Sequence, residues 1–184
     1  PCEHENWYLH CTYGMSGGWF TSPSKHTAFI VEYNGSGLDI LRDTKKVFFN
    51  DSRHFGTLKF IKGDADHNKK LRSLGPCVFD PGLTPEIFTK RMLRKPNRTI
   101  AEALMDQSGV AGIGNYIKAE VLYRAGVSPW RCVTDITPEE YVALHESTSH
   151  VVQGSYESQG ATIKTYKTAD GSAGKGQFPF KIYS

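Results

Sequence analysis

The chemically most informative segment of the chain is VAGIGNY, residues 110–116, in which two glycines and an asparagine precede a predicted helix. Gly112 and Gly114 can adopt backbone angles that are closed to other residues, so the chain can turn sharply there with its amides exposed. Asn115 adds a side-chain donor at the positive end of the helix dipole. Such a turn can bind a phosphate group, although so short a motif on its own more often marks a tight turn between helices.

Cysteine and histidine spacing predicts no metal site. Four cysteines are spread over the chain without the C-x-x-C pair of structural zinc sites, so we expect structural or free thiols at Cys2, Cys11, Cys77 and Cys132. His145 and His150 lack both the i, i+4 spacing and the glutamate of a zinc-binding helix, and we expect them at the surface. The sequence therefore predicts neither a metal nor a cofactor.

The net positive charge of the chain is small, but basic residues are concentrated in one region. Its 184 residues contain 22 basic and 19 acidic side chains, and the net charge of +3 is too small to bind a polyanion through bulk charge alone. Residues 86–131, in contrast, contain eight basic and four acidic side chains, a local surplus that suits a nucleic-acid backbone. Within this region we expect Asp106 and Glu120 to be helix-packing residues and not catalysts.

The composition is that of an ordinary globular protein. The chain is 39% hydrophobic and 22% charged with a mean hydropathy of −0.43, which excludes disordered, collagenous and membrane-embedded classes. No run of about 18 apolar residues occurs, and the first residues lack the basic and apolar regions of a signal peptide. We therefore expect a soluble intracellular protein, in the nucleus or the cytoplasm.

The first 75 residues are predicted to form strands. Four short runs rich in aromatic and β-branched residues are separated by turn-forming residues: 8–14, 27–34, 46–51 and 56–62. No helical pattern interrupts them, which favours an antiparallel sheet or sandwich over parallel β-α-β units.

Beyond Leu74-Gly75-Pro76 the pattern becomes helical. The predicted helices begin at Pro85 after an N-cap at Thr84, at a T-x-x-E capping box from Thr99 to Glu102, near Tyr116, and at a second capping box from Thr137 to Glu140. Their predicted ends are before Pro96, at Ser108-Gly109, at Ala125 before Gly126, and at Gly160. A glycine-rich loop, residues 169–177, and one final strand, residues 178–184, complete the chain, and this strand has no predicted partner.

Residues 103–130 resemble the helix-two-turn-helix motif of the formamidopyrimidine-DNA glycosylase and endonuclease VIII family over 28 consecutive positions. Five further segments resemble family motifs in the same order. Residues 13–17 resemble the L-G-M-S-G turn, residues 51–56 the D-x-R-R-F-G loop, and residues 74–76 the L-G-P that precedes the interdomain linker. Residues 159–162 resemble the Q-G-G-T sequence, and residues 169–178 resemble the D-G-x-x-G-x-F loop. The resemblance covers almost the whole chain.

The resemblance implies an α+β fold, with a partial antiparallel β-sandwich over residues 1–75, a linker over 76–84, a helix-two-turn-helix domain over 85–168, and a glycine-rich loop with the start of a finger over 169–184. It also implies a bifunctional DNA glycosylase/AP lyase that flips an oxidised base out of DNA and displaces it by Schiff-base chemistry. Its partner would be damaged double-stranded DNA, with no membrane involved, and the protein would be a monomer.

The same resemblance assigns DNA contacts to individual residues. Met15, Arg53 and Phe55 would fill the space that a flipped base vacates, with Met15 as an apolar plug and Phe55 as a wedge between base pairs. Arg53 would hydrogen-bond the base that has lost its partner. Gly114 and Asn115 would hold a backbone phosphate next to the flipped nucleotide.

Several positions depart from the family pattern. Pro1 has the chemical type of the nucleophile, but Cys2 and Glu3 follow it in place of E-G-P-E, and only 13 residues separate it from Met15. We therefore expect that Pro1 is not the nucleophile and that this chain alone, which lacks the finger, cleaves little DNA. In addition, Thr12 stands where a phosphate-binding histidine is common, and His54 replaces the second arginine of R-R-F, which reduces the charge near pH 7.

A second interpretation of the same pattern is a noncatalytic nucleic-acid-binding module derived from this fold, for example within a ribonucleoprotein assembly. Helix-two-turn-helix elements also occur in a ribosomal protein family, so this motif alone does not distinguish the two. The presence of Met15, Arg53 and Phe55 favours DNA repair.

Overall fold

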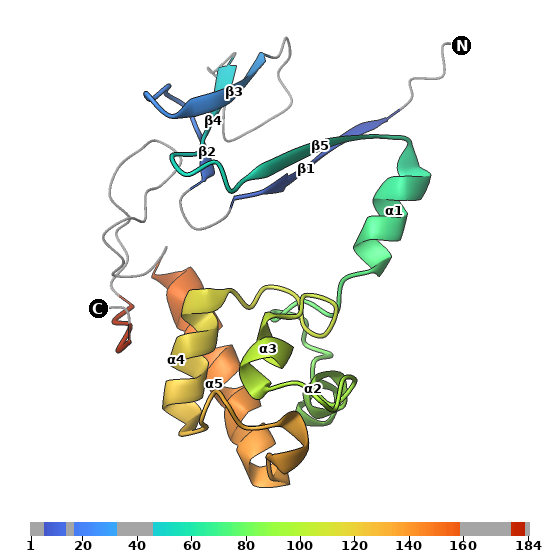
Figure 1. Ribbon diagram of the computed structural model, residues 1–184, viewed down its shortest axis with the longest axis vertical. Coiled ribbons are helices and arrows are strands. Elements are labelled where there is room, and N and C mark those ends of the chain that lie inside the picture. Colours follow the sequence, from blue (N-terminus) through green and yellow to red (C-terminus); the bar gives the residue numbers. More distant parts are fainter. Residues whose placement is uncertain (1–5, 14–16, 33–45, 159–177, 183–184) are drawn as a thin grey trace. The chain divides into compact units, whose positions relative to one another are not determined.

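The computed structural model describes residues 6–13, 17–32, 46–158 and 178–182 (Figure 1). The chain divides into two compact units with a boundary between Asn68 and Lys69. We call the described part before this boundary the strand unit and the part after it the helical unit.

The strand unit contains two antiparallel sheets (Figure 1). One pairs β1 (Trp7–Thr12) with β5 (Thr57–Lys62), and the other has the order β2 (Gly18–Phe20), β4 (Lys46–Asn50), β3 (Thr27–Glu32). The ring of Phe29 on β3 meets that of Phe60 on β5 edge-on, with 5.9 Å between centroids, so aromatic packing joins the two sheets. The antiparallel architecture predicted from the sequence is confirmed, and β2 is an additional strand that the sequence pattern did not reveal.

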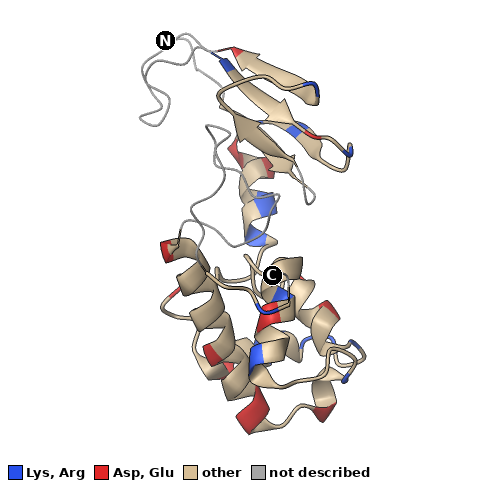
Figure 2. Cartoon of the chain, turned by 90° about the vertical axis from the view of Figure 1, so that its left-hand side faces the viewer, with Lys and Arg blue, Asp and Glu red and all other residues tan. Residues whose placement is uncertain are grey.

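The prediction that the first 75 residues form strands is wrong for its last part, because α1 spans Asp64–Arg72, after the last predicted strand. This helix has no buried residue, and so it lacks the apolar stripe by which helices are recognised in a sequence. Its signal is electrostatic: two aspartates lie in the first turn and three basic residues in the last, which matches the helix dipole (Figure 2). Its first half is attached to β1, where the Tyr8 hydroxyl donates to Asp64 and the Tyr8 ring stacks on His67.

The helical unit contains α2 (Pro85–Met92), α3 (Ile100–Met105), α4 (Asn115–Ala125), the 3-10 helix η2 (Val133–Asp135) and α5 (Pro138–Glu157). The predicted N-caps at Thr84, Thr99 and Thr137 are all present, the last two as complete capping boxes, and Gly126 ends α4 in the left-handed conformation. The hydrophobic core between the helices includes Phe88, Ile100, Leu104, Ile113, Val121 and Leu144. None of the described helices combines the length and the apolar character needed to span a bilayer.

The C-terminal end differs from the sequence-based prediction in two respects. The helix α5 ends at Glu157 with Ser158 as its C-cap, before the predicted end at Gly160. Of the described residues 178–182, only Phe178 takes part in a β-bridge, so they do not form the predicted strand. The amides of Lys181 and Ile182 instead donate to the carboxylate of Glu120, at 2.9 and 2.6 Å, and satisfy a group that is only 4% exposed. Glu120 is therefore buried, as expected of a packing residue, but its carboxylate binds this C-terminal segment and not another helix.

Candidate nucleic-acid interface

The connection from α3 to α4 turns sharply at Gly112, which has a φ of 106°. A Cβ atom at this position would also lie 2.9 Å from a methyl carbon of Val78, so glycine is required both for conformation and for space. Gly114 differs: as N-cap of α4 it has φ −99° and ψ 179°, which any residue can adopt, and a Cβ there would meet nothing within 4 Å. The prediction that both glycines use special backbone angles is thus correct for Gly112 and wrong for Gly114.

The side-chain amide of Gln107 holds this turn in shape. Its Oε1 accepts from the Gly112 amide at 2.9 Å, while its Nε2 donates to the Ile113 carbonyl at 2.8 Å. One side chain therefore satisfies a donor and an acceptor of the turn at the same time. Sequence reasoning did not identify this role, because a glutamine in a turn gives no indication of which backbone groups it will reach.

Asp106 fixes the start of the same connection. Its Oδ1 accepts from the amide and the hydroxyl of Ser108, at 3.0 and 2.7 Å, and its Oδ2 binds Lys95 at 2.6 Å and Arg98 at 3.0 Å. The hydrogen bonds from Lys95 and then Ser108 hold the pKa of this carboxyl far below its usual range. Arg94 adds a hydrogen bond of 2.8 Å to the Ser108 carbonyl. Three basic residues of the segment between α2 and α3, Arg94, Lys95 and Arg98, thus stabilise the turn.

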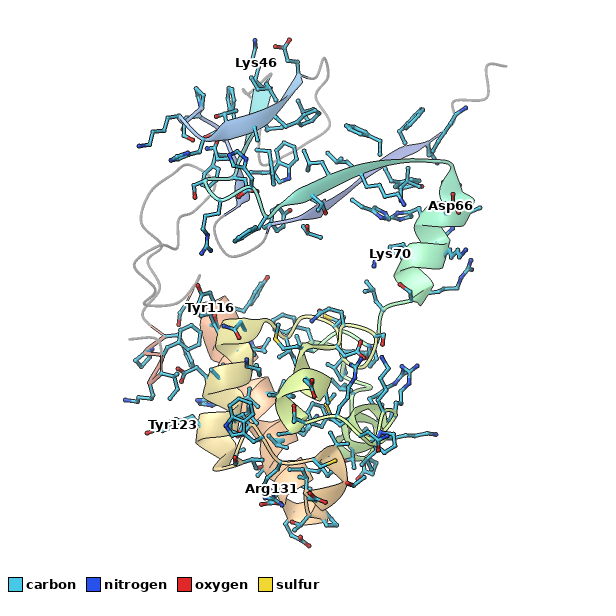
Figure 3. The ribbon with its side chains drawn as sticks, in the orientation of Figure 1. Lys46, Asp66, Lys70, Tyr116, Tyr123 and Arg131 are labelled. Atoms are coloured by element: carbon cyan, nitrogen blue, oxygen red, sulfur yellow. The ribbon has the colours of Figure 1, made fainter. Side chains whose placement is uncertain are left out.

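The N-terminus of α4 is unlike those of the other three α-helices that lie wholly within the described helical unit. The helices α2, α3 and α5 each have a threonine cap and at least one glutamate in the first turn, whereas α4 has neither a side-chain cap nor an acidic residue there. Asn115 is the first residue of α4, and its Oδ1 accepts from the ammonium group of Lys118 at 2.7 Å. Figure 3 shows Tyr116 at this end of α4 and Tyr123 near the other. The positive end of the helix dipole is therefore not balanced by any acidic side chain of its own first turn.

The loop after β4 in the strand unit presents a second set of predicted residues. The buried carboxylate of Asp51, 2% exposed, accepts from the amide of Gly56 at 2.6 Å and from that of Arg53 at 3.3 Å. His54 has a positive φ of 55°, and the chain reverses there. Phe55 is left 68% exposed, and the guanidinium carbon of Arg53 lies 5.7 Å from its ring centroid. The loop therefore displays an apolar ring and a cation side by side.

Asp51 should make the stability of this loop depend on pH. Chiefly the hydrogen bond from Gly56 holds its pKa below the usual value, so the ionised form stabilises the fold above about pH 4, and this contribution is lost as the pH falls through the lowered pKa. In Asp51→Asn an amide NH2 group competes for the space beside these donors, so the variant should melt at a lower temperature at pH 7. Thermal unfolding followed by circular dichroism should show this difference shrink in strongly acidic buffer. A constant difference at all pH values would contradict the role of the charge.

The predicted site residues thus fall into two local groups. Gly114 and Asn115 adjoin at the start of α4, and Arg53 and Phe55 adjoin on the loop after β4. Met15 and Pro1, the other two residues named from the sequence, lie outside the described residues.

The two histidines of α5 differ in exposure. His145 is half-buried, with its Nε2 2.6 Å from the carbonyl of Leu83, so the expectation of a surface position is wrong for His145, whereas His150 is exposed. Cys11, Cys77 and Cys132 are free thiols. Within the described part of the chain, no three His, Cys, Asp or Glu side chains gather closely enough to hold a metal ion.

A protein-family model matches residues 74–167, the range that contains the turn between α3 and α4. This model is described as the formamidopyrimidine-DNA glycosylase H2TH domain. The chain belongs to the formamidopyrimidine-DNA glycosylase family. The family resemblance inferred from the sequence and the α+β fold class are confirmed.

Relatives of this family align with most of the chain. The formamidopyrimidine-DNA glycosylase of Bacillus cereus is 34% identical over 145 residues, which are 78% of this chain and 52% of the relative. That of Exiguobacterium is 32% identical over 97% of this chain and 64% of its own length. The chain thus spans between about half and two thirds of these members of the formamidopyrimidine-DNA glycosylase family.

Solved structures have the same fold. The MutM (Fpg) protein of Thermus thermophilus superposes with a TM-score of 0.75 and 27% identity, over 91% of this chain and 60% of that protein. The Fpg of Lactococcus lactis, solved with DNA containing an abasic site, has a TM-score of 0.71 at 21% identity, over 92% of this chain and 61% of its own. The likeness to the Lactococcus lactis protein concerns the fold alone.

Proposed function

We propose that this chain is the lesion-binding portion of a bifunctional DNA glycosylase/AP lyase that acts on oxidised bases in duplex DNA. The observation that carries the proposal is the turn before α4, where a positive-φ glycine leads into a helix N-terminus that has no side-chain cap and no acidic residue in its first turn. This turn lies within the segment that matches the family model.

The turn before α4 suits a phosphodiester group. The first amides of a helix have no partner within the helix and point along the axis toward the positive end of the dipole. The open space around Gly114 lets an anion approach the backbone closely, which a side chain at this position would obstruct. Asn115 would add a neutral donor to the same oxygen atoms.

The loop after β4 suits the cavity that a flipped base leaves in the helix. Removing a base from the stack costs a few kcal/mol, which an inserted side chain partly restores. The exposed ring of Phe55 can wedge between base pairs, and the adjacent guanidinium of Arg53 can hydrogen-bond the unpaired base. Met15 is proposed as the third member of this group. A mutant of Lactococcus lactis Fpg was crystallised with Fapy-dG-containing DNA and the Fpg of the same organism with abasic-site DNA, and we propose the same class of partner here.

Phe55→Ala tests the lesion-reading half of this proposal. The unmodified chain should bind a duplex with an abasic site more tightly than an intact duplex, because the unstacking penalty is already reduced at the abasic site. The variant should bind the two duplexes with affinities within about twofold of each other. Its dependence on salt should not change, because Phe55 neutralises no phosphate. Fluorescence anisotropy at several salt concentrations measures both quantities.

The outcome of this experiment also distinguishes the two interpretations of the sequence. Equal binding of abasic and intact duplex by the unmodified chain would reject lesion reading and favour a noncatalytic nucleic-acid-binding module. For the lyase activity, borohydride trapping on an abasic duplex detects a Schiff base directly, and blocking Pro1 determines whether this proline forms it.

A further inference from the structure

The first turn of α4 contains a charge that opposes the stability of the helix. Lys118 is the fourth residue of α4, and a cation near a helix N-terminus is disfavoured by the dipole. No acidic residue in this turn compensates it, although glutamates occupy the first turns of α2, α3 and α5. An external anion bound at this end of the helix would provide the compensation.

Lys118 also determines how Asn115 is oriented. The two residues are three positions apart on the same face of α4, and the Lys118 ammonium donates to Asn115 Oδ1 at 2.7 Å. An amide flipped by 180° would place its NH2 group against the ammonium, donor facing donor. Lys118 therefore selects the orientation in which the NH2 group of Asn115 points away from the ammonium group.

We propose that Lys118 is both a phosphate-binding and a positioning residue of the site at the start of α4. This inference rests on the proposed function and adds Lys118 to the residues of the proposed phosphate site. An ammonium group has three donors, and one of them is used on Asn115, so the others can reach an oxygen of the phosphodiester that the Asn115 amide binds. The positive charge of Lys118 then neutralises that phosphate.

The charge function is tested by Lys118→Met, which keeps the length of the side chain and its helix propensity but removes the ammonium. The abasic-duplex affinity of the 184-residue chain should fall about tenfold or more at low salt, and the slope of log affinity against log salt should become shallower by about 1. Arg124→Met is the matched control, because Arg124 is an exposed cation in the last turn of the same helix. It should leave affinity within about twofold and the salt slope unchanged.

The positioning function is tested by a double-mutant cycle with Asn115→Ala. If Lys118 acts partly through Asn115, the double variant should lose less affinity than the product of the two single losses. Lys118→Arg should retain the salt slope and most of the affinity. Thermal unfolding of Lys118→Met should show no loss of stability, because the removed cation was unfavourable to the helix.

Three results would overturn the inference. Strictly multiplicative losses in the cycle would refute the positioning function. Wild-type affinity and salt slope in Lys118→Met, alongside weakened binding by Asn115→Ala, would refute the inference and leave the proposed function intact. Failure of the unmodified chain to bind any duplex would refute both.

Discussion

Replacing Gly112 with alanine should lower the free energy of unfolding of the helical unit by about 2–4 kcal/mol. Part of this loss is backbone strain, because φ is 106° at this position and side chains of L-residues rarely tolerate it. The rest is overlap with Val78, since the new Cβ would lie 2.9 Å from one of its methyl carbons. Denaturant unfolding followed by far-UV circular dichroism measures the difference.

Gly114→Ala is the matched control for this prediction. Its backbone angles suit any residue and a Cβ has open space, so stability should fall by no more than about 1 kcal/mol, the cost of a poorer N-cap. DNA binding by Gly114→Ala should nevertheless weaken, because the added methyl group obstructs the proposed approach of a phosphate to the backbone. Equal stability losses in the two variants would contradict the distinction between a glycine required by the turn and a glycine required by the ligand.

Asn115→Ala should weaken the binding of an abasic-site duplex by about 1.5–3 kcal/mol, which corresponds to a loss of about 10-fold to 150-fold. The variant removes one donor to an anion but no charge, so the salt slope should stay near that of the unmodified chain. This separates it from Lys118→Met, for which we expect a shallower slope. Fluorescence anisotropy with the same duplex measures both variants.

Asn115→Asp provides a control in which the expected effects on stability and binding have opposite signs. A carboxylate at the first position of α4 interacts favourably with the helix dipole and with Lys118, so the melting temperature should be unchanged or higher. The same charge repels a phosphate, so DNA affinity should fall at least as far as in Asn115→Ala. Unchanged DNA binding in both variants would exclude Asn115 from the interface.

The helices of the helical unit and the membership of the family could be predicted from the sequence alone. The capping boxes at Thr99 and Thr137 join residues three positions apart, and the proline after Thr84 acts on its own turn, so these signals do not depend on distant contacts. The same is true of Gly126, which ends α4 through its own backbone angle. Local interactions of this kind are visible in any sequence that contains them.

Tertiary structure decided the features that depend on residues far apart in the chain. Glu120 accepts amides 61 and 62 positions away, and α1 is attached through Tyr8, 56 residues before Asp64, so neither could be assigned from local pattern. The backbone angles of Gly112 and Gly114 also required the structure, because a glycine permits several conformations without indicating which one is used. At the candidate site the sequence therefore identified the turn, while packing determined the orientation of its donors.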